Sequence, residues 1–384
     1  NDLVVGALLA AGAAAMVAAR RIVLDRTALW ALAFAAVGAL SAVLAVPRFG
    51  LTSFELLVSL AYLARWVFYF GVYVVAVNVV RDQDVVGVWR ALETTTLCFA
   101  AFGVLQSAFL PDFAQIVYPS SREYLDWDPQ GHRLVSTFLD PNFAGAFIAI
   151  ALLVQVAGLA VGARVAAWKP LLLALALVLT VSRSSVLAFV AGAVAIVLAR
   201  GVSARVLRLA AVLGVLVAAA FPKLLELARA YNKLQIDPSA LARVISWVRG
   251  VQVVHDHPVI GIGFNTWAFV QERAYGWERA HAATYGIDGG LLFIAALTGA
   301  VGLALYVAML VSVGRRARRV WRERSRPPEP RMLAVGAVAS IVAIVVHSCF
   351  SNSIMLPFLV EPLWVLWALV AVIARTPAPA RDAV

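Results

Sequence analysis

Long apolar runs, separated by short polar connections, recur along the whole chain. A helix needs about 20 predominantly apolar residues to cross the hydrocarbon core of a bilayer. Measured against that length, eleven runs are candidate spans: 3–19, 28–47, 55–80, 88–110, 141–162, 167–181, 185–199, 204–221, 287–313, 332–349 and 353–374. The pattern therefore predicts an all-α, polytopic integral membrane protein with about eleven spans.

The spans and the connections between them divide the chain into six segments. These are N-terminal transmembrane helices (1–110), a first outward loop (111–140), central transmembrane helices (141–221), a large outward loop (222–286), C-terminal transmembrane helices (287–374) and a tail (375–384). An odd number of spans places the two ends on opposite sides of the membrane. Because the sequence begins with Asn1 and not Met, we expect a twelfth span ahead of it in the full-length protein.

Composition agrees with the membrane class, since 63% of the 384 residues are hydrophobic and 14% are charged. The net charge of +11 would by itself suit either nucleic acid or anionic lipid as a partner. Sorted by loop, one alternate set of connections carries 20 basic and seven acidic residues, and the other carries 11 basic and 14 acidic residues. The positive-inside rule assigns the first set to the cytoplasm. The excess charge thus reports orientation and contact with anionic inner-leaflet lipid, with no nucleic acid as partner.

The large outward loop contains a predicted amphipathic helix that begins at Asp237-Pro238, an N-cap followed by a first-turn proline. At 100° per residue its apolar side chains share one face. That face is made of Leu241, Val244, Ile245, Val248 and Val251. We expect the apolar face to be buried on the membrane or over a cavity, with Arg243 and Trp247 pointing away from the buried side.

Four arginines lie beside apolar segments on the outward side, namely Arg133, Arg183, Arg243 and Arg249. A guanidinium binds phosphate oxygens bidentately and stays charged at any relevant pH, so it suits a diphosphate. The alternative is snorkelling to lipid headgroups. The positive-inside rule does not require arginines on this face, which favours a binding site. Arg65 falls in mid-span, where it either pairs with a neighbouring helix or reaches a substrate phosphate from the outer surface.

Two carboxylates and one histidine are candidates for acid–base chemistry. Asp140, followed by Pro141-Asn142, is predicted to cap the fifth span, whose positive N-terminal end suits an anion. Asp288 lies where the large loop enters the ninth span, a position that is costly unless the carboxylate caps, pairs or acts as a base. His281, seven residues earlier, is the rival base.

Two short motifs have the residue types of metal ligands. His255-Asp256-His257-Pro258 places two histidines two residues apart before a turn proline, which is more typical of a loop. Asp126-Trp127-Asp128 places two carboxylates around a tryptophan, a pattern that arises readily by chance. We predict no metal site from either motif.

Four segments, in this order, resemble the O-antigen ligase and polysaccharide polymerase family of bacterial envelope glycosyltransferases. They are Arg133–Asn142, Ser182-Arg183-Ser184-Ser185, Arg243 through His257-Pro258 to Phe264, and Asp288 through Thr298-Gly299 to Gly302. The resemblance implies an inverting transferase of the GT-C type, multi-pass in the bacterial inner membrane, with its site facing the periplasm and with neither metal nor cofactor. It implies transfer of glycan from an undecaprenyl-diphosphate carrier to a hydroxyl, in lipopolysaccharide or polysaccharide biosynthesis of the cell envelope.

The same resemblance suggests roles for the candidates. Donor diphosphate contacts fall to Arg133, Arg183, Arg243, Arg249, Asn142 and Arg65, acceptor or loop positions to Asp140 and Trp247, and the catalytic base to Asp288 or His281. The ligases resemble one another in a His-Asn pair at the position of Asp288-Gly289. An aspartate there is more similar to the polymerase branch, unless His281 takes the histidine's role.

Polymerase is therefore favoured over ligase, with an acceptor glycan or glycolipid and a chain-length regulator as further partners. A lipid-linked glycan transporter or flippase is the competing class, and a membrane scaffold is the third. A transporter would normally show broken helices in two related halves, and the sequence offers no such pair of segments.

Overall fold

The computed structural model describes residues 2–20, 22–118, 132–200, 238–277 and 286–377. Every regular element in these ranges is helical. The helices are α1 (Asp2–Ala18), α2 (Arg26–Phe49), α3 (Ser53–Val79), α4 (Val85–Phe109), α5 (Phe113–Val117), α7 (Pro141–Val161), α8 (Trp168–Leu179), α9 (Arg183–Arg200), α11 (Pro238–Asp256), α12 (Trp267–Tyr275), α13 (Gly290–Arg322), α14 (Pro328–His347) and α15 (Pro357–Ile373). Short 3-10 helices are η1 (Asp82–Asp84), η2 (Ser136–Phe138) and η3 (Ser353–Met355).

Six helical segments in the described part of the chain are long and apolar enough to cross a membrane: α2, α3, η1 with α4, α7, α13 and α14. The apolar helices α1, α8, α9 and α15 are shorter than 18 residues in their apolar part. Ten of the eleven predicted runs thus coincide with a helix, and the run 204–221 lies outside the described residues. The polytopic all-α class is confirmed, with six helices of full spanning length and four shorter apolar helices among the described residues.

Helices begin where side chains satisfy the free N–H groups of the first turn. Asp25 accepts a hydrogen bond from the backbone N–H of Ala28 (3.0 Å) at the start of α2. At the start of α3, Thr52 and Glu55 form a reciprocal capping box. At the start of α7, Asp140 caps and Pro141 occupies the first turn, as the sequence predicts.

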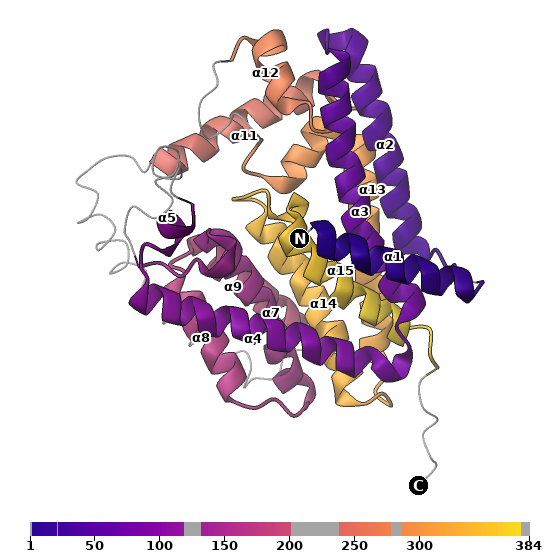
Figure 1. Ribbon diagram of the computed structural model, residues 1–384, viewed down its shortest axis with the longest axis vertical. Helices are drawn as coiled ribbons and strands as arrows, with labels where there is room; N and C mark the ends of the chain where they lie inside the picture. Colours follow the sequence, from indigo (N-terminus) through magenta and orange to yellow (C-terminus); the bar gives the residue numbers. More distant parts are fainter. Residues whose placement is uncertain (1, 21, 119–131, 201–237, 278–285, 378–384) are drawn as a thin grey trace.

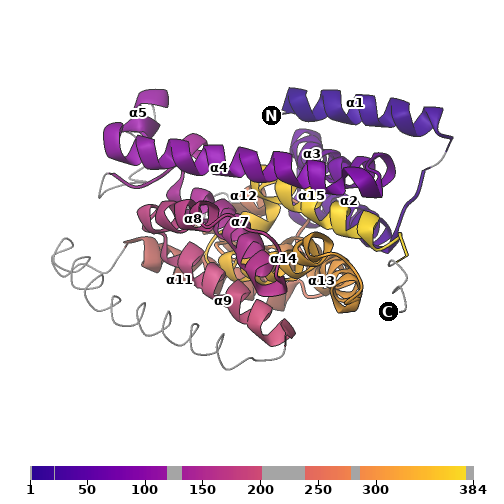
Figure 2. The same ribbon diagram turned by 90° about the horizontal axis from the view of Figure 1, so that it is seen from below.

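Helix α14 lies at the centre of the bundle and joins two groups of helices (Figure 1). One group contains α1, α2, α3 and α13, in which α2 packs on both α3 and α13. The other contains α4, α7, α8 and α9, and α14 packs closely on α7 and α9. Seen from below, α15 runs beside α14 between the two groups, in contact with both α3 and α4 (Figure 2). The functional side chains described below lie at one end of the junction that α14 makes between the groups.

Helix α13 is broken at Gly299, whose backbone has φ 68° and ψ −170°. The segment 258–263, which begins with a turn, lies against this break and pairs with backbone groups that the break exposes. The N–H of Ala300 donates to the carbonyl of Pro258 (2.7 Å), and the N–H of Gly263 donates to the carbonyl of Leu297 (3.0 Å). Glycine is required at position 299 because a Cβ there would lie 2.1 Å from the carbonyl carbon of Val259. These hydrogen bonds hold the large loop that contains α11 against the transmembrane helix α13.

Connections that the positive-inside rule assigns to the same side contact one another. On the predicted cytoplasmic side, Arg316 pairs with Asp25 at 2.8 Å, and Arg375 donates to the carbonyl of Val77 at 2.8 Å. At the opposite end, which carries α11 and α12, Arg273 pairs with Glu55 at 2.7 Å. These contacts follow the alternation of the connections that the sequence predicts.

Candidate functional site

The N-termini of α7 and α9 meet at the end of the bundle that carries α11. The Asp140 carboxylate accepts hydrogen bonds from the N–H groups of Asn142 (2.7 Å) and Phe143 (3.0 Å). The Asn142 side chain in turn accepts from the hydroxyl of Ser182, which immediately precedes α9, at 3.0 Å. Two helix N-termini that lie together offer partial positive charge to an anion.

The close approach of α7 and α9 depends on Gly145 in the second turn of α7. A Cβ at this position would lie 2.5 Å from the hydroxyl oxygen of Ser185 and 3.0 Å from that of Thr180. The hydroxyl of Ser185 donates to the carbonyl of Asn142 at 3.0 Å. A larger residue at Gly145 would separate the two helix N-termini.

Arg133 is held against the turn that connects α8 to α9. Its Nε donates to the carbonyl of Thr180 (2.9 Å), and a terminal nitrogen lies 3.5 Å from the carbonyl of Val181. The backbone of the same segment is fixed by Gln106 of α4, whose side-chain oxygen accepts from the N–H groups of Val135 and Ser136. Arg133 is thus brought to the α7–α9 junction from a distant part of the sequence.

His347, the last residue of α14, is a further member of the site that sequence reasoning missed. Its side chain is completely buried. Nε2 lies 3.2 Å from the hydroxyl oxygens of both Ser184 and Ser185, and Nδ1 lies 2.5 Å from the hydroxyl oxygen of Ser353. In the sequence it is a lone histidine at the end of an apolar run, and only the packing of α14 on α9 shows its partners.

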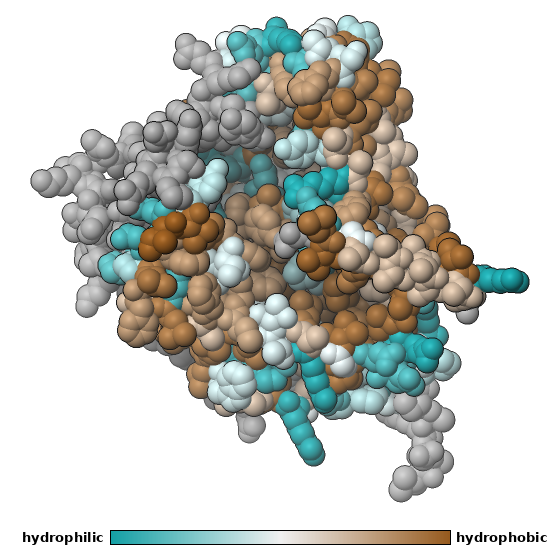
Figure 3. All heavy atoms as spheres, viewed as in Figure 1, coloured by the Kyte–Doolittle hydropathy of each residue, from teal (hydrophilic) through white to brown (hydrophobic). Residues whose placement is uncertain are grey.

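Helix α11 lies over this junction with its polar face toward the protein. Val244, Val248 and Val251 are 49%, 62% and 59% exposed, whereas Ser246 on the other face is fully buried. The alternative in which the apolar face covers a cavity is therefore wrong, whereas the alternative in which it lies on the membrane, with Arg243 and Trp247 on the other side, stays a prediction. The polar face contacts the protein because Ser246 and Trp247 find hydrogen-bonding partners there. Figure 3 shows that this side of the molecule is hollowed beneath the position of α11 in Figure 1.

Asp288 is positioned by α11 through its backbone. The hydroxyl of Ser246 accepts from the N–H of Asp288 at 3.1 Å, and the indole N–H of Trp247 donates to the Asp288 carbonyl. Burial raises the pKa of the Asp288 carboxyl, and the positive charge of Arg243 opposes that rise. A carboxylate with a raised pKa, outside the end of a helix, has the properties of a general base.

Arg243 is the charged group that connects the parts of the site. It lies within electrostatic range of Asp140, Asp288 and His347. Its Nε is buried and has no hydrogen-bond partner among the described residues. Burial also raises the pKa of the Asp140 carboxyl, against the opposing influence of its two N–H donors, of Arg133 and of Arg243. A buried donor without a partner, near two carboxylates with raised pKa values, marks the place where an anionic ligand fits.

The other predicted residues lie at the edge of this cluster, apart from it, or outside the described part of the chain. Arg183 is the first residue of α9, between Ser182 and Ser184, and it is exposed at the surface. Arg249 lies over the ring of Trp277, 5.1 Å from its centroid. His281 is outside the described residues, as are Asp237 and the motif 126–128.

Arg65 pairs with Asp2 of the neighbouring helix α1 at 3.1 Å, whereas its predicted contact with a donor phosphate stays a prediction. It also lines a cavity of about 170 Å³ between α3, α13 and the start of α15. Leu356 and Pro357, at the beginning of α15, line the same cavity. Arg65 is in the middle of the long helix α3, but it lies at the same depth as the first residues of the shorter helix α15.

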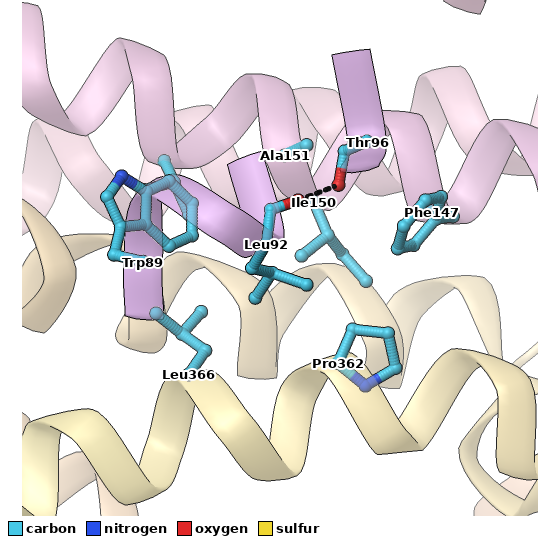
Figure 4. Close-up of a pocket in the computed structure, with 9 residues that line it drawn as sticks. Trp89, Leu92, Thr96, Phe147, Ile150, Ala151, Pro362 and Leu366 are labelled. Atoms are coloured by element: carbon cyan, nitrogen blue, oxygen red, sulfur yellow. Dashed lines mark hydrogen bonds between the residues drawn. The ribbon is translucent and has the colours of Figure 1, made fainter. Parts of the chain in front are cut away.

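A second, small pocket lies between α4, α7 and α15 (Figure 4). Trp89, Leu92, Ile150 and Leu366 contribute to its lining, and the hydroxyl of Thr96 already donates to the carbonyl of Leu92 at 2.9 Å. None of the described residues that line it is titratable. It is an apolar crevice in the helix packing and lacks groups for acid–base chemistry.

The histidine motif of the large loop has a structural partner. Nδ1 of His257 lies 3.0 Å from a terminal nitrogen of Arg48. Burial and the neighbouring Arg48 charge lower the pKa of His257. The neutral ring accepts a hydrogen bond from Arg48 and helps to hold the end of α11 against α2.

Comparison with known proteins agrees with the motifs in the sequence. Residues 170–307 match the family model described as O-antigen ligase. The matched range contains the N-terminus of α9, the whole of α11, Asp288 and the part of α13 that includes its break, and it ends at Val307. No curated protein matches the chain. The match over residues 170–307 is consistent with the O-antigen ligase and polymerase family, and the resemblance that the sequence motifs indicate is confirmed over this segment.

Proposed function

We propose that the chain is a glycosyltransferase that moves glycan from an undecaprenyl-diphosphate carrier to the hydroxyl of an acceptor sugar. The family implies a glycosyltransferase-like enzyme, and the donor, the acceptor and the roles below are our proposal. The observation that carries it is the position of Arg243, which lies within electrostatic range of both Asp140 and Asp288. Its buried Nε lacks a partner in the described part of the chain.

The donor diphosphate fits at the junction of α7 and α9. Two helix N-termini, the guanidinium groups of Arg133 and Arg243 and the Asn142 side chain lie around this place, and Arg183 begins α9 beside it. As the bond between the sugar C1 and the phosphate oxygen breaks, negative charge develops on the diphosphate. Fixed cations and helix dipoles interact with this developing charge, so they stabilise the transition state more than the ground state and lower the barrier.

The acceptor is activated by Asp288. Its carboxylate accepts the proton of the acceptor hydroxyl while the hydroxyl oxygen forms the new bond to C1. The bond from C1 to the carrier phosphate breaks with its electron pair, and undecaprenyl diphosphate leaves. Attack from the face opposite the leaving group inverts the configuration at C1. His281, which lies outside the described residues, remains the alternative base.

The site is proposed to face the periplasm, and the membrane to be the bacterial inner membrane. The end of the bundle that carries α11 and α12 is the one with fewer basic residues in its connections, and the positive-inside rule places such connections outside. Lipid-linked donors reach this end within the bilayer. No group other than the chain's own residues takes part in the proposed steps.

Aspartate at position 288 favours a polymerase, which uses a second carrier-linked glycan as the acceptor. The alternative is a ligase that transfers glycan to lipid A core, and the description of the matching family favours that activity. The two activities share the donor and the chemistry at C1. They differ in the acceptor alone, so product analysis separates them.

The test is reconstitution of the protein in liposomes with an undecaprenyl-diphosphate oligosaccharide, with and without lipid A core. A ladder of lengthening carrier-linked glycan supports polymerase activity, and glycan on lipid A core supports ligase activity. If neither product forms and intact carrier crosses the bilayer, the enzyme proposal is wrong and a flippase is supported.

A further inference from the structure

His347 connects two parts of the site that belong to different regions of the chain. On one side its Nε2 contacts Ser184 and Ser185, the second and third residues of α9 (3.2 Å each). On the other side its Nδ1 contacts Ser353 of η3 at 2.5 Å. The ring is completely buried and shielded from solvent.

The hydrogen-bond donors around the ring define which nitrogen carries the proton. Ser185 has a single hydroxyl proton, and it donates that proton to the Asn142 carbonyl, which can only accept. Nε2 must then be the donor to Ser185. In a neutral imidazole Nδ1 is then an acceptor, and it receives the hydroxyl proton of Ser353. We assign the Nε2–H tautomer to His347 on this basis.

Each contact leads to a different functional group. Ser184 and Ser185 follow Arg183 directly, and the hydroxyl of Ser185 donates to the carbonyl of Asn142. The residues that contact Nε2 are therefore linked to the proposed diphosphate site. On the Nδ1 side, η3 packs against the start of α13, because a Cβ on Gly290 would lie 2.5 Å from Ile354. The N–H of Gly290, two residues after Asp288, donates to the Ser348 carbonyl at 2.5 Å. The Nδ1 side therefore leads to the proposed base.

We propose that His347 is a positioning residue that fixes the diphosphate-binding arginine and asparagine relative to the base. It acts through the three serines and takes no part in proton transfer with the substrate. The inference rests on the proposed function for the identity of the two groups that it aligns. A single buried imidazole, with Nε2 as donor and Nδ1 as acceptor, sets the distance between them.

Two substitutions separate the two contacts. In His347→Gln the side-chain amide nitrogen lies near the position of Nε2, so it still donates to Ser184 and Ser185 but loses Ser353. In His347→Asn the side-chain oxygen lies near the position of Nδ1, so it still accepts from Ser353 but loses the serines of α9. We expect His347→Gln to lower kcat by about 10-fold or more with little change in KM for the donor, since one lost hydrogen bond corresponds to that factor. We expect His347→Asn to raise KM for the donor by a similar factor.

Binding of undecaprenyl diphosphate, measured by quenching of intrinsic tryptophan fluorescence in detergent, gives a readout independent of turnover. His347→Asn should weaken binding by about 10-fold and His347→Gln should not, again by the loss of one hydrogen bond. Ser340→Ala is the matched control, because it removes a different buried hydrogen bond of α14, the one that Trp367 donates at 3.2 Å. It should leave binding, kcat and KM unchanged.

The inference is overturned if His347→Gln and His347→Asn change kcat and KM alike, or if both behave as Ser340→Ala does. A loss that follows only the drop in Tm across the three variants would show a purely structural role and would also overturn it. Failure of the proposed function is distinguishable from failure of this inference, because in the first case the wild-type protein itself forms no glycan product. The binding measurement still tests the two variants in that case.

Discussion

Replacement of Gly299 by alanine tests the packing of the loop that carries α11 into the break of α13. The substitution adds a single methyl group in the middle of a long helix, where alanine is ordinarily favourable. Here the backbone has φ 68° and ψ −170°, a region that is essentially restricted to glycine. The added Cβ would lie 2.1 Å from the carbonyl carbon and oxygen of Val259 and 2.4 Å from the nitrogen of Ile260.

The expected cost has two parts. Backbone strain in this region costs about 1–3 kcal/mol. The contacted atoms are backbone atoms of the 258–263 segment, so relief of the overlap displaces that segment and lengthens the hydrogen bonds from Ala300 to Pro258 and from Gly263 to Leu297, now 2.7 and 3.0 Å. Loss of two such bonds costs about 1–3 kcal/mol in total. We expect Gly299→Ala to lower the free energy of unfolding by about 2–6 kcal/mol, the sum of these terms.

The assay is thermal unfolding in detergent, followed by tryptophan fluorescence, with two alanine substitutions as controls. Gly276 also has a positive φ of 61°, but its added Cβ meets nothing within 4 Å, so Gly276→Ala reports strain alone. Gly314 lies in α13 with open space around its Cβ, so Gly314→Ala should be neutral or slightly stabilising. The Tm should be highest for Gly314→Ala, intermediate for Gly276→Ala and lowest for Gly299→Ala. Equal Tm values for Gly276→Ala and Gly299→Ala would refute the insertion of the 258–263 segment into the break.

Three further predictions concern the base, the orientation and the core. Burial raises the pKa of Asp288, so its carboxylate is protonated, and kcat/KM should fall, at a higher pH than for an ordinary aspartate, and a midpoint in the ordinary aspartate range of about 3.9 would contradict this. A membrane-impermeant maleimide should label Glu272→Cys in intact cells whose two native cysteines are replaced, whereas labelling only after permeabilisation would reverse the orientation. Asp25→Asn or Arg316→Leu should each destabilise the fold by about 1–3 kcal/mol, with partial recovery in the double variant, because each leaves a half-buried charge without its partner, and unfolding in denaturant measures this.

Local signals predict the start of α7 and the grouping of the basic connections. Asp140 followed by Pro141 favours the start of a helix, because the aspartate caps the first turn and this contact does not depend on distant residues. The same is true of the basic connections, because the charge of a short loop can be counted without the fold. Such features are encoded within a few residues, and the sequence alone is sufficient to predict them.

The direction of α11 and the role of His347 depend on long-range packing. The hydrophobic pattern identifies the apolar face of α11, but it does not reveal that Ser246 and Trp247 on the other face hold the backbone of Asp288, which is about 40 residues away in the sequence. The hydrogen-bond partners of His347 in α9 are 162 and 163 residues away. A hydrophobic pattern cannot identify such partners, since it reports only the alternation of polar and apolar positions on one helix.

Turnover by the Arg243→Ala and Arg249→Ala variants tests the central claim most directly. Both arginines lie on α11, but Arg243 lies within electrostatic range of Asp140 and Asp288, whereas Arg249 stacks on Trp277. In liposomes with an undecaprenyl-diphosphate oligosaccharide, Arg243→Ala should lower the rate of glycan transfer by about 100-fold or more, the usual loss when a group that stabilises transition-state charge is removed. Arg249→Ala should retain most of the wild-type rate. Equal rates in the two variants would contradict the assignment of the site to the junction of α7, α9 and α11.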